Sequence, residues 1–400
     1  MKTNSALQVL YDGRLVGTLA MTANHKAAFQ YGEEWLEHGF SISPFSLPLK
    51  NQVFVPNKDY FDGLFGVFTD SLPDNWGSLL LNRLLRANGQ NPDKLTVLDR
   101  LAIVGTSGMG ALTYYPEREI QEKQGHSNLD ELAEQCQKLL NTEYSDKLDE
   151  LYRLGGTSGG SRPKIMTTID GEEWIIKFPA HVDGRNAGKM EYDYSCCAKQ
   201  CGITMSETRL FPSDKCEGYF GTKRFDRVID NGTQKRIHML TAAALLELDF
   251  EQTSLDYHSL MKLTKILTRD YLEDVNNMFR RMCFNVFAHN RDDHSKNFTY
   301  LYHEAENRWR LSPAYDLTYS NTYYGEHTTT VDGNGRNPGE KEILAVGVAA
   351  FAGVTVANVH TAIATVRMHA MSCFLNVFIS FLHILLYFSP LLKKKTPPPP

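Results

Sequence analysis

The start of the chain alternates between apolar and polar positions, as β-strands do. Leu7 and Val9 belong to one alternating run, Asp12-Gly13 follows it, and a second alternating run comes next. Asp-Gly between two such runs predicts a β-hairpin, because both residues tolerate the positive φ of a tight hairpin turn. A further strand is expected near Ala27–Tyr31.

A helical period replaces this alternation between Phe61 and Asn88. Leucines recur three and four positions apart in SLLLNRLLRANG, which is typical of an amphipathic helix. Gly89 stands just beyond the last periodic residue, so the pattern predicts a helix that ends with this glycine as its C-cap.

The segment from residue 116 to residue 150 is more strongly charged than the chain before it. It carries one predicted helix, which we expect to begin with a capping box formed by Ser127 and Asp130. We interpret the segment as a surface-facing helical connector. It separates an N-terminal α+β subdomain, residues 1–115, from the rest of the chain.

The second half begins with a glycine-rich turn that we expect to be flanked by two short β-like runs, in LGGTSGGSRPKIMTTIDGEEWIIKFPA. Helical patterns follow near Met190–Gln200 and through most of Ala242–Ala288. Apolar residues from Val275 to Phe287 recur at the spacing of one helix face, which makes this the clearest helix in the chain. Two strands, FTYLY and RWRLS, come next. We divide this half into residues 151–240 and 241–367.

The chain ends in an atypical apolar tail. The stretch from Met371 to Leu392 approaches the length of a transmembrane helix, but Asn376, His383 and Pro390 interrupt it. Because polar residues are costly in hydrocarbon, we predict that the tail is not a membrane anchor. A membrane-anchored protein is an alternative that only this tail supports.

Composition narrows the class of protein. A length of 400 residues predicts two or three subdomains, and a 42% hydrophobic share argues against disorder. A net charge of −5 does not suggest a chain that coats nucleic acid, so any DNA contact is expected through a partner. The odd number of cysteines indicates no disulfide framework, and we interpret Cys196, Cys197 and Cys201 as buried residues. No secretory signal begins the sequence, so a cytoplasmic location is expected.

Phosphoryl transfer requires a phosphate cradle, a cation, metal ligands and a carboxylate near the incoming hydroxyl. The cradle candidate is GGTSGG, from Gly155 to Gly160. Glycines let backbone N–H groups approach phosphate closely, and Thr157 and Ser158 add two hydroxyls. The motif also fits an ordinary flexible turn, and a second glycine cluster, residues 105–110, lacks the lysine of a Walker A loop.

The cation candidate is Lys177, which ends the β-like run WIIK. In kinases a strand lysine contacts the nucleotide phosphates and pairs with a glutamate on the following helix. Glu191 is the expected partner here. The alternative is a lysine at a strand edge that faces water.

The most specific pattern is NRDDHSKN, residues 290–297, followed by Asp316 in LSPAYD. Asp292 precedes Asn297 by five residues, which is the spacing of the base and the metal-binding amide in kinase catalytic loops. Carboxylate and amide oxygens suit Mg²⁺, so Asn297 and Asp316 are the candidate metal ligands. The alternative is a polar helix-to-strand loop that Asn297 caps.

Two further groups leave alternatives open. His289 and His294 stand near two aspartates and would suit zinc, although the sequence suggests no third ligand. The charged run KRFDR, residues 223–227, fits either a solvated strand edge or a hinge beside a nucleotide.

Taken in order, GGTSGGSRPK, WIIK, KRFDR, NRDDHSKN and LSPAYD resemble the motifs of HipA-like toxins, which are serine/threonine protein kinases. The earlier pieces LVGTL, FSLPL, FTDSLPDNWG and VGTSGMGAL resemble the first subdomain of that family. The resemblance covers about residues 7–367. It implies a two-lobed α/β kinase fold of the phosphatidylinositol-kinase-like type, with an N-terminal α+β subdomain.

The resemblance also implies roles for individual residues. Asp292 would be the catalytic base, Asn297 and Asp316 would bind Mg²⁺, and either Thr157 or Ser158 would be autophosphorylated. The residues expected to bind ATP are Lys177, Gly156, Thr157, Ser158, Gly159, Gly160, Glu191, Arg224, Phe225 and His294.

The implied function is that of a growth-arresting toxin that uses ATP and Mg²⁺ to phosphorylate a cellular protein, such as an aminoacyl-tRNA synthetase. The implied partners are this protein substrate and a helix-turn-helix antitoxin that supplies DNA binding. An alternative is a catalytically weak relative that acts as a corepressor subunit with the same partner. Residues 368–400 depart from the family pattern, and a shifted reading frame near Arg367 would explain the change.

Overall fold

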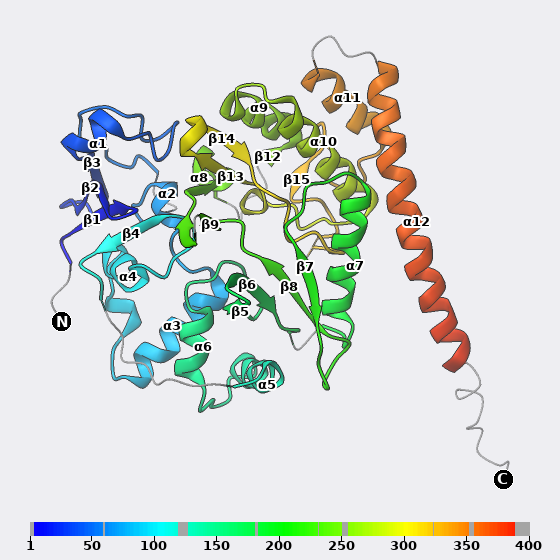
Figure 1. Ribbon diagram of the computed structural model, residues 1–400, viewed down its shortest axis with the longest axis horizontal. Helices are drawn as coiled ribbons and strands as arrows, with labels where there is room; N and C mark the ends of the chain where they lie inside the picture. Colours follow the sequence, from blue (N-terminus) through cyan, green and yellow to red (C-terminus); the bar gives the residue numbers. More distant parts are fainter. Residues whose placement is uncertain are drawn as a thin grey trace.

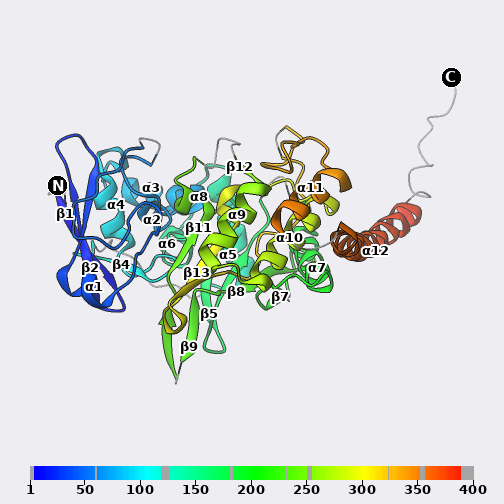
Figure 2. The same ribbon diagram turned by 90° about the horizontal axis from the view of Figure 1, so that it is seen from above.

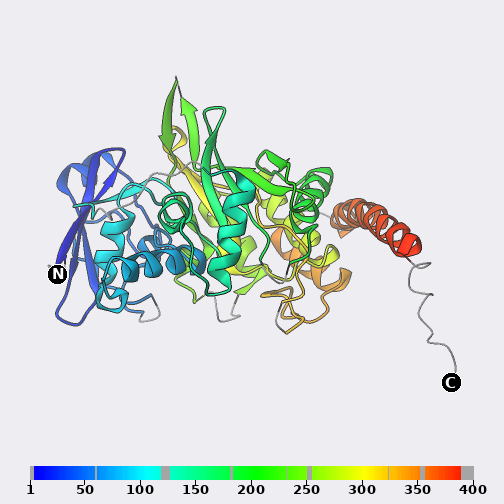
Figure 3. The same ribbon diagram turned by 90° about the horizontal axis from the view of Figure 1, so that it is seen from below.

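The computed structural model describes residues 4–58, 61–118, 127–180, 183–230, 232–249, 255–322, 324–351 and 356–388. A small α+β subdomain lies at one end, the two lobes of a kinase-like fold follow it, and the last helix lies at the other end (Figure 1). Figures 2 and 3 show the same succession from two further directions.

The first subdomain is built on a four-stranded antiparallel sheet in the order β3-β2-β1-β4. Its strands are β1 (Ala6–Tyr11), β2 (Arg14–Met21), β3 (Ala27–Tyr31) and β4 (Leu112–Tyr115). Its helices are α1 (Glu33–His38), α2 (Gly66–Thr69), α3 (Asn75–Ala87), η1 (Pro92–Lys94) and α4 (Val97–Val104). The predicted hairpin and third strand are confirmed, and Asp12 and Gly13 take φ values of 49° and 75° in the turn.

The helical pattern predicted between residues 61 and 88 corresponds to two helices, α2 and α3. Pro73 stands between them; it has no N–H to donate, and it disfavours a helical conformation at Leu72. Asp74 thereby becomes the N-cap residue of α3. The C-cap is Asn88, and Gly89 follows it with a φ of 68°.

The connector contains α5 (Leu129–Leu140), and α6 (Leu148–Gly155) follows directly. The capping box is formed by Asn128 and Glu131, so the prediction of Ser127 and Asp130 is wrong by one residue. Ser127 instead binds the Glu150 carboxylate through its N–H at 2.9 Å and its hydroxyl at 2.8 Å. The prediction that the connector is surface-facing holds for one side of it only. Its apolar side packs with α3 and with the strands β5 and β6 in one hydrophobic core. The buried residues of this core include Leu132, Cys136, Leu139, Trp76, Leu80, Leu151, Ile165 and Ile176.

The first kinase lobe is a four-stranded sheet in the order β5-β6-β8-β7, with α7 packed against it. These elements are β5 (Lys164–Ile169), β6 (Glu172–Lys177), β7 (Thr208–Phe211), β8 (Tyr219–Lys223) and α7 (Ala187–Gln200). The prediction that two β-like runs flank the glycine-rich turn is wrong, because the turn follows the helix α6 and both strands, β5 and β6, lie after it. A hairpin of β9 (Arg227–Asp230) and β10 (Thr233–Arg236) extends from the body (Figures 2 and 3).

The second lobe is mainly helical. Its helices are α8 (Ala242–Leu246), α9 (Tyr257–Thr268), α10 (Leu272–Phe287), η2 (Ser295–Asn297), η3 (Glu304–Glu306) and α11 (Glu340–Ala350). Its strands are β11 (Met239–Thr241), β12 (Leu255–Asp256), β13 (Thr299–His303), β14 (Arg308–Leu311) and β15 (Thr329–Thr330). The apolar face predicted for α10 is buried, from Val275 to Val286, and the chain then enters the NRDDHSKN loop.

The last helix, α12 (Val356–Phe388), packs on α7, α10 and α11 through its first half. Val359, Ile363, Val366 and Ala370 are buried there, and Figure 1 shows the remainder of α12 leading away from the body. Among the residues that the structure describes, no helix is both long enough and apolar enough to cross a membrane. Residues 389–400 lie outside the description, and the shifted reading frame stays a prediction.

Candidate active site

A cleft of about 250 Å³ lies where the glycine-rich loop, β6 and the NRDDHSKN loop meet. All of the residues expected at the site line it except Gly156 and Thr157. Those that do so are Ser158, Gly159, Gly160, Lys177, Glu191, Arg224, Phe225, Asp292, His294, Asn297 and Asp316. Fold topology thus brings together groups that the sequence spreads over more than one hundred and fifty positions.

Lys177, at the end of β6, lies between two carboxylates. Its Nζ donates to Glu191 Oε1 on α7 at 2.6 Å, and it also donates to Asp316 Oδ1. Burial opposes the charge of Lys177, but Asp316 and Glu191 together raise its pKa above the ordinary value. The predicted pair with Glu191 is therefore present, and Lys177 is not a strand-edge lysine that faces water.

Asp316 and Asn297, which also line the cleft, carry side-chain oxygen atoms that could bind a metal ion. Burial disfavours ionisation of Asp316, but the ammonium groups of Lys177 and Lys164 lower its pKa to about 2. Its φ of 53° is unusual for a residue with a side chain, and such backbone conformations gather at functional sites. Asn297 Nδ2 donates to the carbonyl oxygen of Asp292 at 2.7 Å, so Oδ1 is the amide atom left for a metal ion.

The adjacent aspartates of the loop have different surroundings. The Asp292 side chain is 59% exposed, and its Oδ1 lies 3.8 Å from His294 Nε2. The Asp293 side chain is fully buried and accepts four hydrogen bonds. Its donors are Tyr257 Oη at 2.9 Å, His327 Nδ1 at 3.0 Å, Thr328 N at 2.9 Å and Thr329 N at 3.1 Å. Asp293 therefore holds the loop in place, and Asp292 is the carboxylate that faces the cleft.

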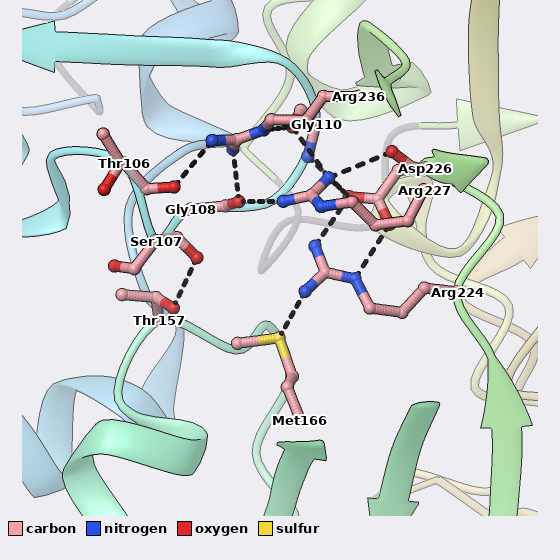
Figure 4. Close-up of polar contacts among 10 residues, drawn as sticks. All are labelled: Thr106, Ser107, Gly108, Gly110, Thr157, Met166, Arg224, Asp226, Arg227 and Arg236. Carbon is pink, nitrogen blue, oxygen red and sulfur yellow. Dashed lines mark hydrogen bonds and ion pairs between the residues drawn. The ribbon is translucent and has the colours of Figure 1, made fainter. Parts of the chain in front are cut away.

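The glycine-rich loop contacts the first subdomain through a side-chain hydrogen bond (Figure 4). Thr157 Oγ1 donates to the carbonyl oxygen of Ser107 at 3.0 Å, and Ser158 Oγ donates to that of Gly155 at 2.6 Å. Both side chains are buried, with residue exposures of 8% and 1%. Trp76 on α3 contacts the start of β5, the strand that follows the loop, since its Nε1 donates to the Lys164 carbonyl at 3.1 Å.

Three residues of the cleft were not expected from the sequence. Asp74, the N-cap residue of α3, accepts a hydrogen bond from the Gly160 amide at 2.8 Å and pairs with Lys296. It thereby joins the glycine-rich loop to the NRDDHSKN loop. Lys164 is buried, and its Nζ donates to the Gly159 carbonyl at 2.6 Å.

The pKa of Lys164 is lowered to about 8. Burial is the main cause; Asp316 opposes the shift and Lys177 adds to it. Both lysines and Asp74 stood in motifs that carried the resemblance, but nothing in their spacing indicated that they meet.

The zinc interpretation gains no support. Within the part of the chain that the structure describes, no three His, Cys, Asp or Glu side chains converge in a way that could hold a metal ion. The cysteine prediction is confirmed for Cys197, which is buried on α7, and for Cys201, which is buried at the C-cap of this helix, whereas Cys196 is partly exposed.

Comparisons with known proteins agree with the motifs. A model of the HipA-like C-terminal domain matches residues 156–373, and a model of the HipA N-terminal domain matches residues 7–115. A protein of Sinorhizobium fredii (strain NBRC 101917 / NGR234) described as "Putative kinase Y4mE" is 26% identical over 349 residues, which cover 79% of this chain and 77% of the relative.

A solved structure supports the same fold. It is HipA of the Shewanella oneidensis MR-1 toxin–antitoxin system, in complex with HipB and operator DNA. The TM-score is 0.69 at 16% sequence identity, and the match covers 93% of this chain and 91% of the other. The expected two-lobed kinase-like fold with an N-terminal subdomain is confirmed.

Proposed function

The chain belongs to the HipA-like kinase family, and from this premise we propose that it is an ATP- and Mg²⁺-dependent serine/threonine protein kinase. The observation that carries the proposal is the arrangement around Lys177. One lysine, whose side chain is only 13% exposed, pairs with a helix glutamate and with the candidate metal ligand Asp316, while Asp292 lies exposed at the same cleft.

The residues present fit ATP and Mg²⁺. Lys177 and Lys164 supply positive charge for phosphate oxygens, and Gly159 and Gly160 allow the backbone to approach them. Asn290 Oδ1 is buried at the cleft and has no hydrogen-bond partner within the described residues. Asn297 and Asp316 would hold Mg²⁺, and the ion would supply positive charge that offsets the negative charge of the phosphates during transfer.

Asp292 is the base in this proposal. The substrate hydroxyl oxygen forms a bond to the γ-phosphorus, the bond from that phosphorus to the β–γ bridging oxygen breaks, and ADP leaves with the electron pair. Asp292 accepts the proton of the hydroxyl. Asp293 cannot take this role in its present position, because its carboxylate is fully buried and its two oxygens already accept four hydrogen bonds.

Autophosphorylation of Thr157 or Ser158 follows from the same chemistry. Both hydroxyls are buried and bonded to carbonyl oxygens, so the loop has to leave its described position before either can react. A phosphate adds about −1.5 to −2 charges at neutral pH, which would repel the nucleotide's own phosphates. The modification would therefore switch the kinase off.

The remaining parts of the proposal concern partners. The protein substrate is a cellular protein, of which an aminoacyl-tRNA synthetase is one example, and a helix-turn-helix antitoxin supplies DNA binding in the cytoplasm. The complex of the Shewanella oneidensis structure supports such a partner. The alternative, a corepressor subunit without catalysis, leaves the polar groups of the cleft without a role.

Mass spectrometry tests the proposal. The chain is incubated with ATP, Mg²⁺ and a cell lysate, and phosphorylated residues are then mapped on the chain and on lysate proteins. We expect new phosphoserine or phosphothreonine on a lysate protein and one added phosphate on the chain, both absent with Asp292→Asn. No modification by folded protein that binds ATP would favour the corepressor alternative.

A further inference from the structure

Three cysteines meet where α12 packs against the end of α7, two helices that lie side by side in Figure 1. Cys197 belongs to the last turn of α7, Cys201 is the C-cap residue of this helix, and Cys373 lies on α12. Their thiols reach across the contact in both directions. Cys201 Sγ donates to the Val366 carbonyl oxygen of α12 at 3.7 Å, and Cys373 Sγ donates to Gln200 Oε1 of α7 at 3.4 Å.

The register of the two helices places Cys197 beside Cys373. Cys197 Sγ donates to the His369 carbonyl oxygen at 4.0 Å. In an α-helix the carbonyl of one residue faces the amide of the fourth residue after it, so this oxygen points toward the turn that carries Cys373. A hydrogen bond with the Cys201 thiol, burial and a hydrogen bond with the Cys373 thiol together raise the pKa of Cys197. The sulfur atoms of Cys197 and Cys373 are therefore in contact while both are still thiols.

The three thiols differ in their access to solvent. Cys197 and Cys201 are each only 3% exposed, whereas Cys373 is partly exposed at the edge of the helix contact. A dissolved oxidant can therefore reach Cys373 first, and the buried Cys197 waits next to it. An accessible thiol with a second thiol beside it is the arrangement of redox-sensitive cysteine pairs. Apolar packing explains the two buried cysteines, but it gives no reason for a third thiol at the solvent edge of the same contact.

We propose that Cys373 and Cys197 form a reversible disulfide when the chain meets a peroxide, and that this bond fastens α12 to α7. Cys201 is not the partner, because it stands one turn from Cys197 at the end of the same helix and a bond between them would join α7 only to itself. The described thiol form suits a reducing compartment, where disulfides are transient and report oxidants. The inference goes beyond the proposed function and needs no phosphoryl transfer.

The reaction has two steps. The thiolate of Cys373 attacks one oxygen of the peroxide, the O–O bond breaks, and the other oxygen leaves as hydroxide, so that Cys373 becomes a sulfenic acid. The sulfur of Cys197 then attacks the sulfur of Cys373, and the S–O bond breaks. The oxygen leaves as water with the proton that Cys197 loses. The two thiols are oxidised and the peroxide is reduced, and a dithiol reverses the bond by thiol–disulfide exchange.

The test treats the full chain with hydrogen peroxide, alkylates the remaining thiols and maps the tryptic peptides by mass spectrometry without reduction. We expect one cross-linked pair that contains Cys197 and Cys373, and dithiothreitol should separate it. Cys196 and Cys197 share the tryptic peptide of residues 190–199, so two matched variants assign the bond. Cys197→Ser and Cys373→Ser should abolish the cross-link, whereas Cys196→Ser and the distant Cys136→Ser should keep it.

Thermal unfolding gives a second readout. The peroxide-treated wild type should unfold several degrees higher than the reduced protein, because a cross-link between distant segments restricts the unfolded chain, and Cys373→Ser should show no such rise. Folded wild-type protein whose Cys373 stays alkylatable, or is oxidised only to a sulfinic acid, would overturn the proposal. Protection of all three thiols by added zinc, without a cross-link after its removal, would identify a metal site and would also overturn it. Neither outcome depends on whether the chain is an active kinase.

Discussion

Substituting Asp292 and Asp293 one at a time distinguishes a catalytic role from a structural role in the NRDDHSKN loop. Asp293→Asn keeps the shape of the side chain but replaces one oxygen by an NH₂ group. The oxygen that accepts from Thr328 N and Thr329 N can remain, whereas the other, which accepts from Tyr257 Oη and His327 Nδ1, is lost. Each hydrogen bond to a charged group contributes about 1.5–3 kcal/mol, so the loss of two predicts roughly 3 kcal/mol or more.

That loss is a large part of a typical unfolding free energy of about 5–15 kcal/mol. With a urea dependence of about 1–3 kcal/mol per molar, the midpoint of unfolding should fall by roughly 1 M or more. Asp292→Asn changes an exposed side chain, so it should leave the midpoint within error. The effect of Asp292→Asn should instead appear in turnover, which should fall by about 10²–10⁴-fold, the range for loss of a positioned base.

The assay combines urea unfolding, followed by tryptophan fluorescence, with phosphotransfer measured where both variants are folded. ATP affinity serves as the control, because neither aspartate is a proposed phosphate ligand. If Asp293→Asn is as stable as the wild type but inactive, while Asp292→Asn keeps near-full turnover, the assignment of the base is wrong.

Three further predictions follow from the cleft. Because the pKa of Lys164 is lowered to about 8, its positive charge is lost as pH rises through that value, so the KM for ATP should increase between pH 7 and 9, and Lys164→Arg should remove this dependence. Asp74→Ala removes the carboxylate that contacts both the Gly160 amide and Lys296. Because a charge-assisted hydrogen bond contributes about 1.5–3 kcal/mol, this substitution should raise the KM for ATP by roughly tenfold or more. An unchanged KM would show that Asp74 does not position the glycine-rich loop. Thr157→Val should prevent the inactivation that ATP causes on preincubation if Thr157 is the modified residue, and a single added phosphate that persists in this variant would direct attention to Ser158.

Features encoded within a few residues were predictable from the sequence. The turn at Asp12-Gly13 and the buried face of α10 follow from local pattern, because the hairpin turn and the helix period act over short stretches. The pairing of Lys177 with Glu191 was predictable as well, since a kinase strand lysine has a known kind of partner on the next helix. Asp292 could be preferred over Asp293 from the spacing to Asn297, and the burial of Asp293 agrees with that choice.

Contacts between distant segments were not predictable. Asp74 and Lys296 are 222 positions apart, and only the packing of the first subdomain against the kinase part brings them together. The hydrogen bond from Arg236 to the Thr106 carbonyl is of the same kind, because these two residues are 130 positions apart. Errors also arose where two local signals compete. Asn128, for example, forms the N-cap of α5 in place of Ser127.

The most direct test of the kinase assignment is transfer of label from [γ-³²P]ATP by the purified chain, with and without Mg²⁺, beside Asp292→Asn. Labelled protein is expected only when Mg²⁺ and Asp292 are both present, while ATP binding persists in the variant. Equal labelling by Asp292→Asn, or no labelling by folded wild-type protein that binds ATP, would contradict it.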